Sequence, residues 1–302
     1  MKTDRFSCSR EQEDYQKNPR KPTQFKAIWI SDVHLGTPES HAERLLELLQ
    51  LTESETLYLV GDIVDRLELK RHRYWEQSDA KVVEAIVEKA SQGTRVVFVP
   101  CTRGAPFRKF VGQYLKGIPI QDELVHVTAQ GKRMLVLHGD RFDRAANNAL
   151  WLRYCGTHLA PTVQRLLQAV DNWRERIGLT DRSLPGWQDI EPVDAVYLRS
   201  FAQALTSEAK QKGLDGVICS HVHKPEIREI SGILYCNDGD WAAHQSAMVE
   251  DLSGALRLVT WQDIILQSDR AALCEDLAAS ESQALLIGNA RRIPTGLSAQ
   301  PV

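Results

Sequence analysis

The chain has 302 residues, a length that predicts one large domain or two small ones. Hydrophobic residues make up 43% of it and charged residues 25%, an ordinary balance for a globular protein with a sizeable core. The net charge of −3 does not indicate a surface that binds a polyanion, and no nucleic-acid partner is expected.

The cysteines and the N-terminal segment indicate the compartment. Six cysteines are scattered along the chain without a C-x-x-C pair, so neither a disulfide framework nor a cysteine zinc site is expected. Residues 1–24 are charged and lack the apolar stretch of a secretory signal. No stretch approaches the ~20 apolar residues that span a bilayer. We therefore expect a cytoplasmic protein, soluble or peripheral to a membrane.

The first half of the predicted domain alternates strands and helices. Short apolar runs that end in polar loops predict buried strands. Segments 43–51 and 80–90 have the apolar spacing of helices. The strands are expected at 27–30, 56–60 and 95–99. This alternation is typical of parallel βαβ units.

The second half begins with a predicted hairpin, in which apolar runs at 124–127 and 133–137 flank a short turn. Helical spacing follows, and we interpret about 143–213 as a helical cap insertion. Later strands are expected at 216–219, 226–230, 233–236, 247–251 and 256–261. The predicted organisation is a flexible tail over 1–24, a domain over 25–262 and a C-terminal tail over 263–302.

Polar clusters stand at the ends of several predicted strands, where α/β sheets bind their ligands. Carboxylates and imidazoles suit Mn²⁺, Fe, Zn²⁺ or Mg²⁺. Each cluster alone has an ordinary explanation as a turn cap or a buried histidine, but together they indicate a two-metal centre that acts on a phosphoryl group. The clusters are Asp32-Val33-His34, Gly61-Asp62-Ile63-Val64-Asp65, His138-Gly139-Asp140 and His221-Val222-His223.

In this order the clusters resemble the motifs of the calcineurin-like metallophosphoesterases. Over about residues 25–262 the chain is more closely similar to their UDP-2,3-diacylglucosamine pyrophosphatase group. The resemblance implies a four-layer α/β/β/α sandwich with a helical cap. It also implies hydrolysis of a pyrophosphate bond in a nucleotide-lipid, a lipid A precursor, by a metal-activated water. The similar stretches are 28–36, 57–63, 136–140, 216–223 and 237–241.

The resemblance also implies the metal ions and their ligands. Two divalent ions are expected, with Mn²⁺ as the expected metal. Asp62 would bridge them. Asp65 and Asp140 would support the ligands or cap turns. The other implied ligands are Asp32, His34 and His223 for the first ion, and His138 and His221 for the second.

The third motif departs from the family, which has G-N-H-D, or G-N-R-D in the pyrophosphatase group. Thr102 stands where an asparagine would ligate the second ion, and Gly104 replaces the final aspartate. A threonine hydroxyl is a shorter and weaker donor, so the second site is expected to bind its ion less tightly. Arg103 is expected to contact substrate phosphate and assist catalysis through its fork of donors. Asp240 is a further predicted substrate contact, with orientation of a ligand or capping of a turn as its alternative roles.

Several functions stay open at this stage. The first is hydrolysis of the nucleotide-lipid, with peripheral contact of the protein with the inner membrane and acyl chains held by the cap. The second is a generic phosphoesterase that acts on another substrate. The third is a weakened or non-catalytic descendant that binds a phosphorylated ligand or a protein. The altered segment from Cys101 to Gly104 distinguishes them.

Overall fold

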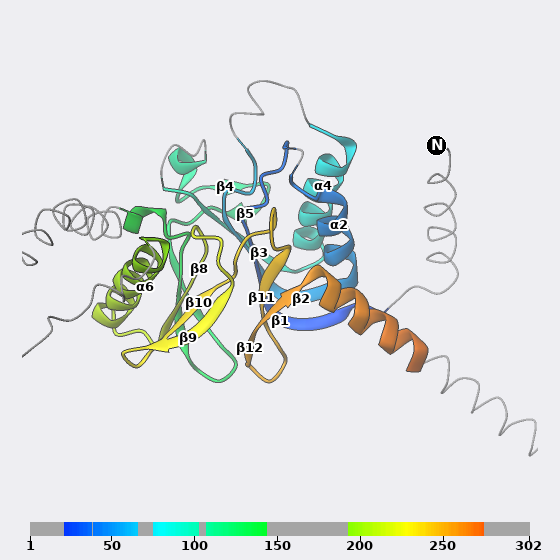
Figure 1. Ribbon diagram of the computed structural model, residues 1–302. Coiled ribbons are helices and arrows are strands. Elements are labelled where there is room, and N and C mark those ends of the chain that lie inside the picture. Colours follow the sequence, from blue (N-terminus) through cyan, green and yellow to red (C-terminus); the bar gives the residue numbers. More distant parts are fainter. Residues whose placement is uncertain (1–20, 38, 66–74, 103–106, 144–192, 275–302) are drawn as a thin grey trace, which may run out of the picture.

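The computed structural model describes residues 21–37, 39–65, 75–102, 107–143 and 193–274. Two five-stranded β-sheets pack face to face at its centre, and helices cover both outer faces (Figure 1). The predicted four-layer α/β/β/α sandwich is therefore confirmed.

The first sheet has parallel strands at its centre and antiparallel strands at one side. It consists of β1 (Thr23–Ser31), β2 (Thr52–Gly61), β3 (Arg95–Pro100), β11 (Ser246–Glu250) and β12 (Leu256–Thr260). Its order is β12-β11-β1-β2-β3, in which β1, β2 and β3 run parallel. Helices α2 (Ala42–Leu51) and α4 (Gln77–Ser91) connect these three strands, as the sequence predicts.

The second sheet is also mixed, and its order is β6-β7-β8-β10-β9. It contains β6 (Leu124–Val127), β7 (Arg133–Val136), β8 (Gly216–Cys219), β9 (Glu226–Ile230) and β10 (Ile233–Asn237). The parallel strands are β7, β8 and β10. Strands β6 and β7 form the predicted hairpin. The helix α6 (Val193–Gln211) lies on the outer face of this sheet (Figure 1).

Three buried clusters fill the spaces between the four layers. Leucines of α2 pack on the outer face of the first sheet together with Val82 and Ile86 of α4. Trp29 and Tyr58 of the first sheet meet Met134 and Ile218 of the second, and the rings of Trp29 and Tyr58 stack at 5.1 Å. The third cluster joins α6 to the second sheet. The central strands are buried on both faces, which is why they are continuous apolar runs in the sequence.

Short elements complete the described chain. A hairpin of β4 (Tyr114–Leu115) and β5 (Ile118–Pro119) follows the 3₁₀ turn η1 (Arg108–Phe110). A second 3₁₀ turn, η2 (Asp140–Phe142), follows His138. Within the described residues, no helix combines the length and apolar character needed to cross a membrane.

The predicted C-terminal tail from residue 263 is corrected for its first residues. The chain is helical over 261–274, directly after β12. Ile264 is fully buried and belongs to the core cluster of the first sheet. Trp261 and Ile265 pack partly against the same cluster. These few apolar contacts lie in the first turns of the helix and leave little periodicity for a sequence to reveal.

The predicted cap over 143–213 is corrected in its last part. Residues 144–192 lie outside the described residues, and nothing here tests them. Residues 193–211 form α6, where Phe201 and Leu205 are fully buried against Leu135 and Val217 of the second sheet. This segment is therefore a layer of the sandwich rather than a cap. Helical spacing identifies an apolar face but not the surface that it meets.

Phe201→Ala tests this placement of α6. We expect the free energy of unfolding to fall by about 3–5 kcal/mol, because a fully buried ring is removed from a packed core. Gln203→Ala, on an exposed position of the same helix, is the matched control and should change it by less than about 0.5 kcal/mol. Urea denaturation measures both. Equal effects would contradict α6 as part of the core.

Candidate metal centre

The predicted polar clusters converge at one edge of the sandwich. Asp32 follows β1 and Asp62 follows β2 in the first sheet, while His138 follows β7 and His221 follows β8 in the second. Parallel strands end at the same edge of a sheet, so the fold itself carries these side chains together.

Asp32 is the point at which the clusters meet, and it is only 1% exposed. The Asp62 N–H donates to its Oδ1 (3.1 Å), which also lies 3.2 Å from His138 Nε2. The His221 N–H donates to its Oδ2 (3.3 Å), and His223 Nε2 lies 3.4 Å from the same oxygen. One buried carboxylate thus contacts residues from both sheets.

The loops around Asp32 have unusual backbone conformations. Eight described residues other than glycine have positive φ, and four of them are predicted ligands: Asp32, His34, His221 and His223. Such conformations cost energy and persist where the surroundings fix them, often at functional sites.

Gly61 gives Asp32 and His138 the space they occupy. Its φ is +77°, and a Cβ added there would lie 2.5 Å from both Asp32 Oδ1 and His138 Cδ2. No side chain fits at this position. The G-D turn after β2 is therefore a steric requirement of the centre, in addition to being a strand-to-loop turn.

The first group of candidate ligands matches the sequence prediction in part. Donor atoms of Asp32, His34 and His223 all lie within 4.8 Å of one another, as a single ion would require. Asp62 borders this group through its backbone, because its carbonyl accepts from the His34 N–H at 2.9 Å. Its carboxylate is not among the gathered donors.

A second group contains a residue that the sequence did not predict as a ligand. Donor atoms of Cys101, His138 and Asp140, all buried, also lie within 4.8 Å of one another. The Cys101 thiol donates to Asp140 Oδ2 (3.1 Å). A lone cysteine carries no metal signature in sequence. Its place directly after β3, in the altered third motif, was the available signal.

Asp140 holds the altered third motif in place. The Thr102 N–H donates to Asp140 Oδ2 (2.9 Å), and the Thr102 hydroxyl donates to the same oxygen. The Thr102 hydroxyl, which stands in place of the family's asparagine ligand, is therefore hydrogen-bonded to Asp140. Arg103, the predicted phosphate contact, lies outside the described residues.

Each predicted histidine ligand has a carboxylate beside one of its ring nitrogens. This arrangement orients imidazoles around metal ions and increases their basicity. The sequence anticipated such support from Asp65, Asp140 and Asp240, but it gave no role to Asp143. The pairs are His34–Asp65 (3.6 Å), His138–Asp140 (3.2 Å), His221–Asp143 (2.7 Å) and His223–Asp240 (3.5 Å).

Asp240 was predicted to contact substrate, to orient a ligand or to cap a turn, and its surroundings favour the last two roles. It is 1% exposed, and its Oδ2 accepts from the Ala243 N–H (2.9 Å) while Oδ1 accepts from the His244 N–H (3.1 Å). Such burial does not favour direct contact with a substrate. Asp240 caps the turn after β10 and orients His223.

The electrostatics of the centre favour a cation. Burial alone would raise the pKa of Asp32, but the positive charge of the nearby His138 imidazolium and the contacts with His223 and Ser220 hold it well below its usual range. Burial alone would lower the pKa of His138, but the carboxylates of Asp32 and Asp140 raise it well above its usual range. Burial also raises the pKa of Asp62. The clustered carboxylates thus attract positive charge.

The residues present fit a divalent metal ion. Neither ring nitrogen of His138 has a well-aligned hydrogen-bond partner among the described residues, although each lies 3.2 Å from a carboxylate oxygen. Buried nitrogens without partners are uncommon and call for an explanation. An ion bound by neutral imidazole and carboxylates supplies one, and its binding would release the His138 proton.

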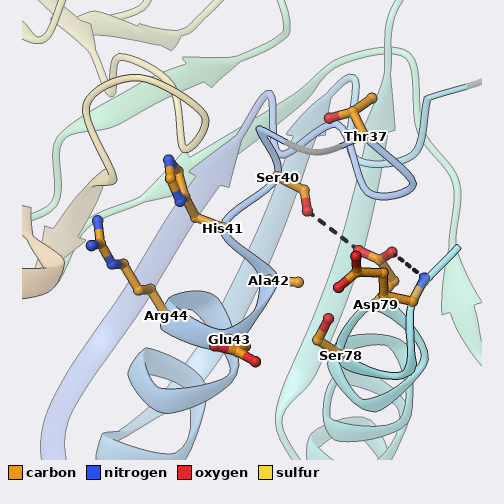
Figure 2. A pocket seen from close by; sticks show the side chains of 9 residues that line it. Thr37, Ser40, His41, Ala42, Glu43, Arg44, Ser78 and Asp79 are labelled. Atoms are coloured by element: carbon orange, nitrogen blue, oxygen red, sulfur yellow. Dashed lines mark hydrogen bonds between the residues drawn. The ribbon is translucent and has the colours of Figure 1, made fainter. Parts of the chain in front are cut away.

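A separate polar hollow of about 330 Å³ lies at the N-terminal ends of α2 and α4 (Figure 2). Thr37 on its rim donates to the His34 carbonyl (2.9 Å), so the hollow borders the metal-ligand loop. It contains none of the predicted ligands. Its acidic lining, which includes Glu43, Glu76 and Asp79, does not favour an anionic substrate.

Gly61→Ala tests the steric requirement, and Gly93→Ala is the matched control. Both glycines have positive φ, but a Cβ at Gly93 would meet nothing within 4 Å. Both changes should cost about 1–3 kcal/mol of backbone strain. Only Gly61→Ala should also displace Asp32 and His138, adding at least about 1 kcal/mol and lowering metal content. Urea denaturation measures the free energy of unfolding, and plasma emission spectrometry measures the metal bound per chain. Equal losses in both variants would contradict the steric role.

Comparison with known proteins adds little to this geometry. No protein-family model matches the chain, and no curated protein sequence matches it. Several solved structures do match. The phosphoesterase Yfce from E. coli is 17% identical with a TM-score of 0.42, covering 78% of this chain and 93% of that one.

Two further matches are similar in extent. A novel archaeal phosphodiesterase is 12% identical with a TM-score of 0.37, covering 77% of this chain and 98% of that one. Vps29 from Entamoeba histolytica, complexed with Zn²⁺, is 12% identical with a TM-score of 0.33, covering 77% and 96%. All three TM-scores are below 0.5, so these similarities do not assign a function to this chain. The function proposed below rests on the geometry of the centre.

Proposed function

We propose that the chain is a metal-dependent phosphoesterase with two divalent ions. The observation that carries the proposal is the convergence of four histidines, each beside its own carboxylate, around the buried Asp32. Histidines that bind a metal ion almost always have a carboxylate, carbonyl or water partner on the other ring nitrogen. Four clustered histidines that each lie beside a carboxylate fit that arrangement better than a purely structural role. When bound, two ions lower the pKa of a water and neutralise charge on a phosphoryl group.

The side chains divide between the two ions. Asp32, His34 and His223 would hold the first, and their donor atoms already lie together. Asp62, at the turn after β2, would supply the shared carboxylate, which stands outside both gathered groups of donors. His138 and His221 would hold the second ion, and their rings lie 5.0 Å apart. The carboxylates behind these imidazoles keep them in place while substrate exchanges.

The altered third motif makes the second site unequal to the first. The Thr102 hydroxyl donates its hydrogen to Asp140. Its oxygen keeps lone pairs for an ion, but it is a shorter and weaker neutral ligand than an asparagine carbonyl. The additional donors gathered with His138 are the sulfur of Cys101 and a carboxylate oxygen of Asp140. Sulfur favours Zn²⁺ over Mn²⁺, so the proposed Mn²⁺ suits the first site better than the second.

The proposed substrate is a nucleotide-lipid pyrophosphate such as UDP-2,3-diacylglucosamine, with a generic phosphoester as the alternative. The similarity of the sequence motifs to the pyrophosphatase group supports the first. The experiment compares release of UMP from UDP-2,3-diacylglucosamine with hydrolysis of bis-p-nitrophenyl phosphate, with Mn²⁺ or Zn²⁺ supplied. Hydrolysis of the diester alone favours the generic enzyme. No hydrolysis of either, with metal bound, favours a non-catalytic binder of phosphorylated ligands.

Asp62→Asn tests the shared carboxylate. We expect it to remove most of the bound metal and to lower the hydrolytic rate by at least about 100-fold. Mutation of a residue that only supports a metal ligand already lowers metal affinity or activity by about 10–100-fold. Glu84→Gln, on an exposed position of α4, removes one charge elsewhere and should leave both unchanged. Metal per folded chain and initial rates are measured together. Full metal occupancy in Asp62→Asn would refute the assignment.

A further inference from the structure

The β4–β5 hairpin and the turn η1 before it present large apolar side chains to solvent. Tyr114 is 74% exposed, Leu115 52% and Phe110 39%. All three lie within residues 109–117, where every residue except Val111 is exposed. Apolar groups that gather at an exposed tip, rather than being scattered singly, mark a surface that meets an apolar partner.

The charge around this tip differs in sign from that of the whole chain. Residues 107–121 contain three basic residues and no acidic one, whereas the chain carries −3. Arg108 is paired with Asp122, its Nη2 lying 3.0 Å from Oδ2. Lys109 and Lys116 therefore supply the local positive charge, and the Lys109 ammonium lies 5.0 Å from the Phe110 ring centroid. Aromatic and lysine side chains together are typical of segments at a membrane interface.

The apolar surface continues inward from the tip. Leu115 and Ile118 line a hollow of about 210 Å³ whose other walls include Phe98 and Phe107. The lining is apolar apart from Lys116. This hollow offers an apolar surface to an acyl chain of a lipid beside the hairpin. A polar partner would not bury it against apolar groups.

We propose that the β4–β5 hairpin docks on a bilayer that contains anionic lipids. Tyr114 and Leu115 enter the headgroup region, while Lys109 and Lys116 contact lipid phosphates. A protein partner is a poorer fit, because a stable interface buries roughly 800 Å² on each side and each strand of this hairpin is two residues long. The proposal does not depend on hydrolytic activity.

Co-sedimentation of the full chain with vesicles tests the proposal. The chain should bind vesicles that contain phosphatidylglycerol and bind phosphatidylcholine vesicles weakly. Added salt should weaken the binding. Lys109→Gln with Lys116→Gln should weaken it about 30-fold, since each lysine near an anionic surface contributes roughly fivefold. Tyr114→Ser with Leu115→Ser should weaken it by at least about tenfold.

The matched control is Leu252→Ser, at a 61% exposed leucine in the turn between β11 and β12. It should bind anionic vesicles as the unchanged chain does. Circular dichroism verifies that every variant is folded. Absence of binding to anionic vesicles, or equal binding by the hairpin variants and the control, would overturn the proposal. A change of oligomeric state in the hairpin variants, without a change in vesicle binding, would indicate a protein interface instead.

Discussion

The buried carboxylate of Asp32 is the interaction on which the centre depends. It is 1% exposed and lies at the end of β1, in the first sheet, yet its partners His138, Ser220 and His223 come from the second. A buried charge without such partners would cost several kcal/mol. The packing of the two sheets therefore brings together the groups that balance the charge of Asp32. A shift of one sheet against the other would leave this buried carboxylate without its partners.

Carboxylates around this core fix the imidazoles before any ion arrives. Asp143 accepts from the Tyr197 hydroxyl of α6 and lies 2.7 Å from His221 Nε2, so a helix of the outer layer also positions the centre. Leu35 and Ile63, next to the ligand loops after β1 and β2, line the same apolar hollow as Leu115 of the β4–β5 hairpin. The proposed metal centre and the proposed membrane surface are therefore neighbours, which suits an amphiphilic substrate.

The strands of the two five-stranded sheets and most of the described helices could be predicted, because the buried strands are apolar runs and turns follow them. The short β4–β5 hairpin was not predicted. The positions of Asp32, Asp62, His138 and His221 at the ends of those runs made their convergence predictable as well. The contact between His221 and Asp143 was not, since 78 residues separate them and only tertiary packing brings them together. The assignment of α6 to a cap failed because periodicity does not identify a helix's partner.

The most direct test is crystallographic. Crystals of the chain grown with Mn²⁺ and with Zn²⁺ can be measured at the absorption edge of each metal. The account predicts one anomalous peak among Asp32, His34 and His223 and a second beside His138, with the Asp62 carboxylate between them. Peaks at surface sites only, with none within coordination distance of Asp32, would contradict the metal centre and the function derived from it.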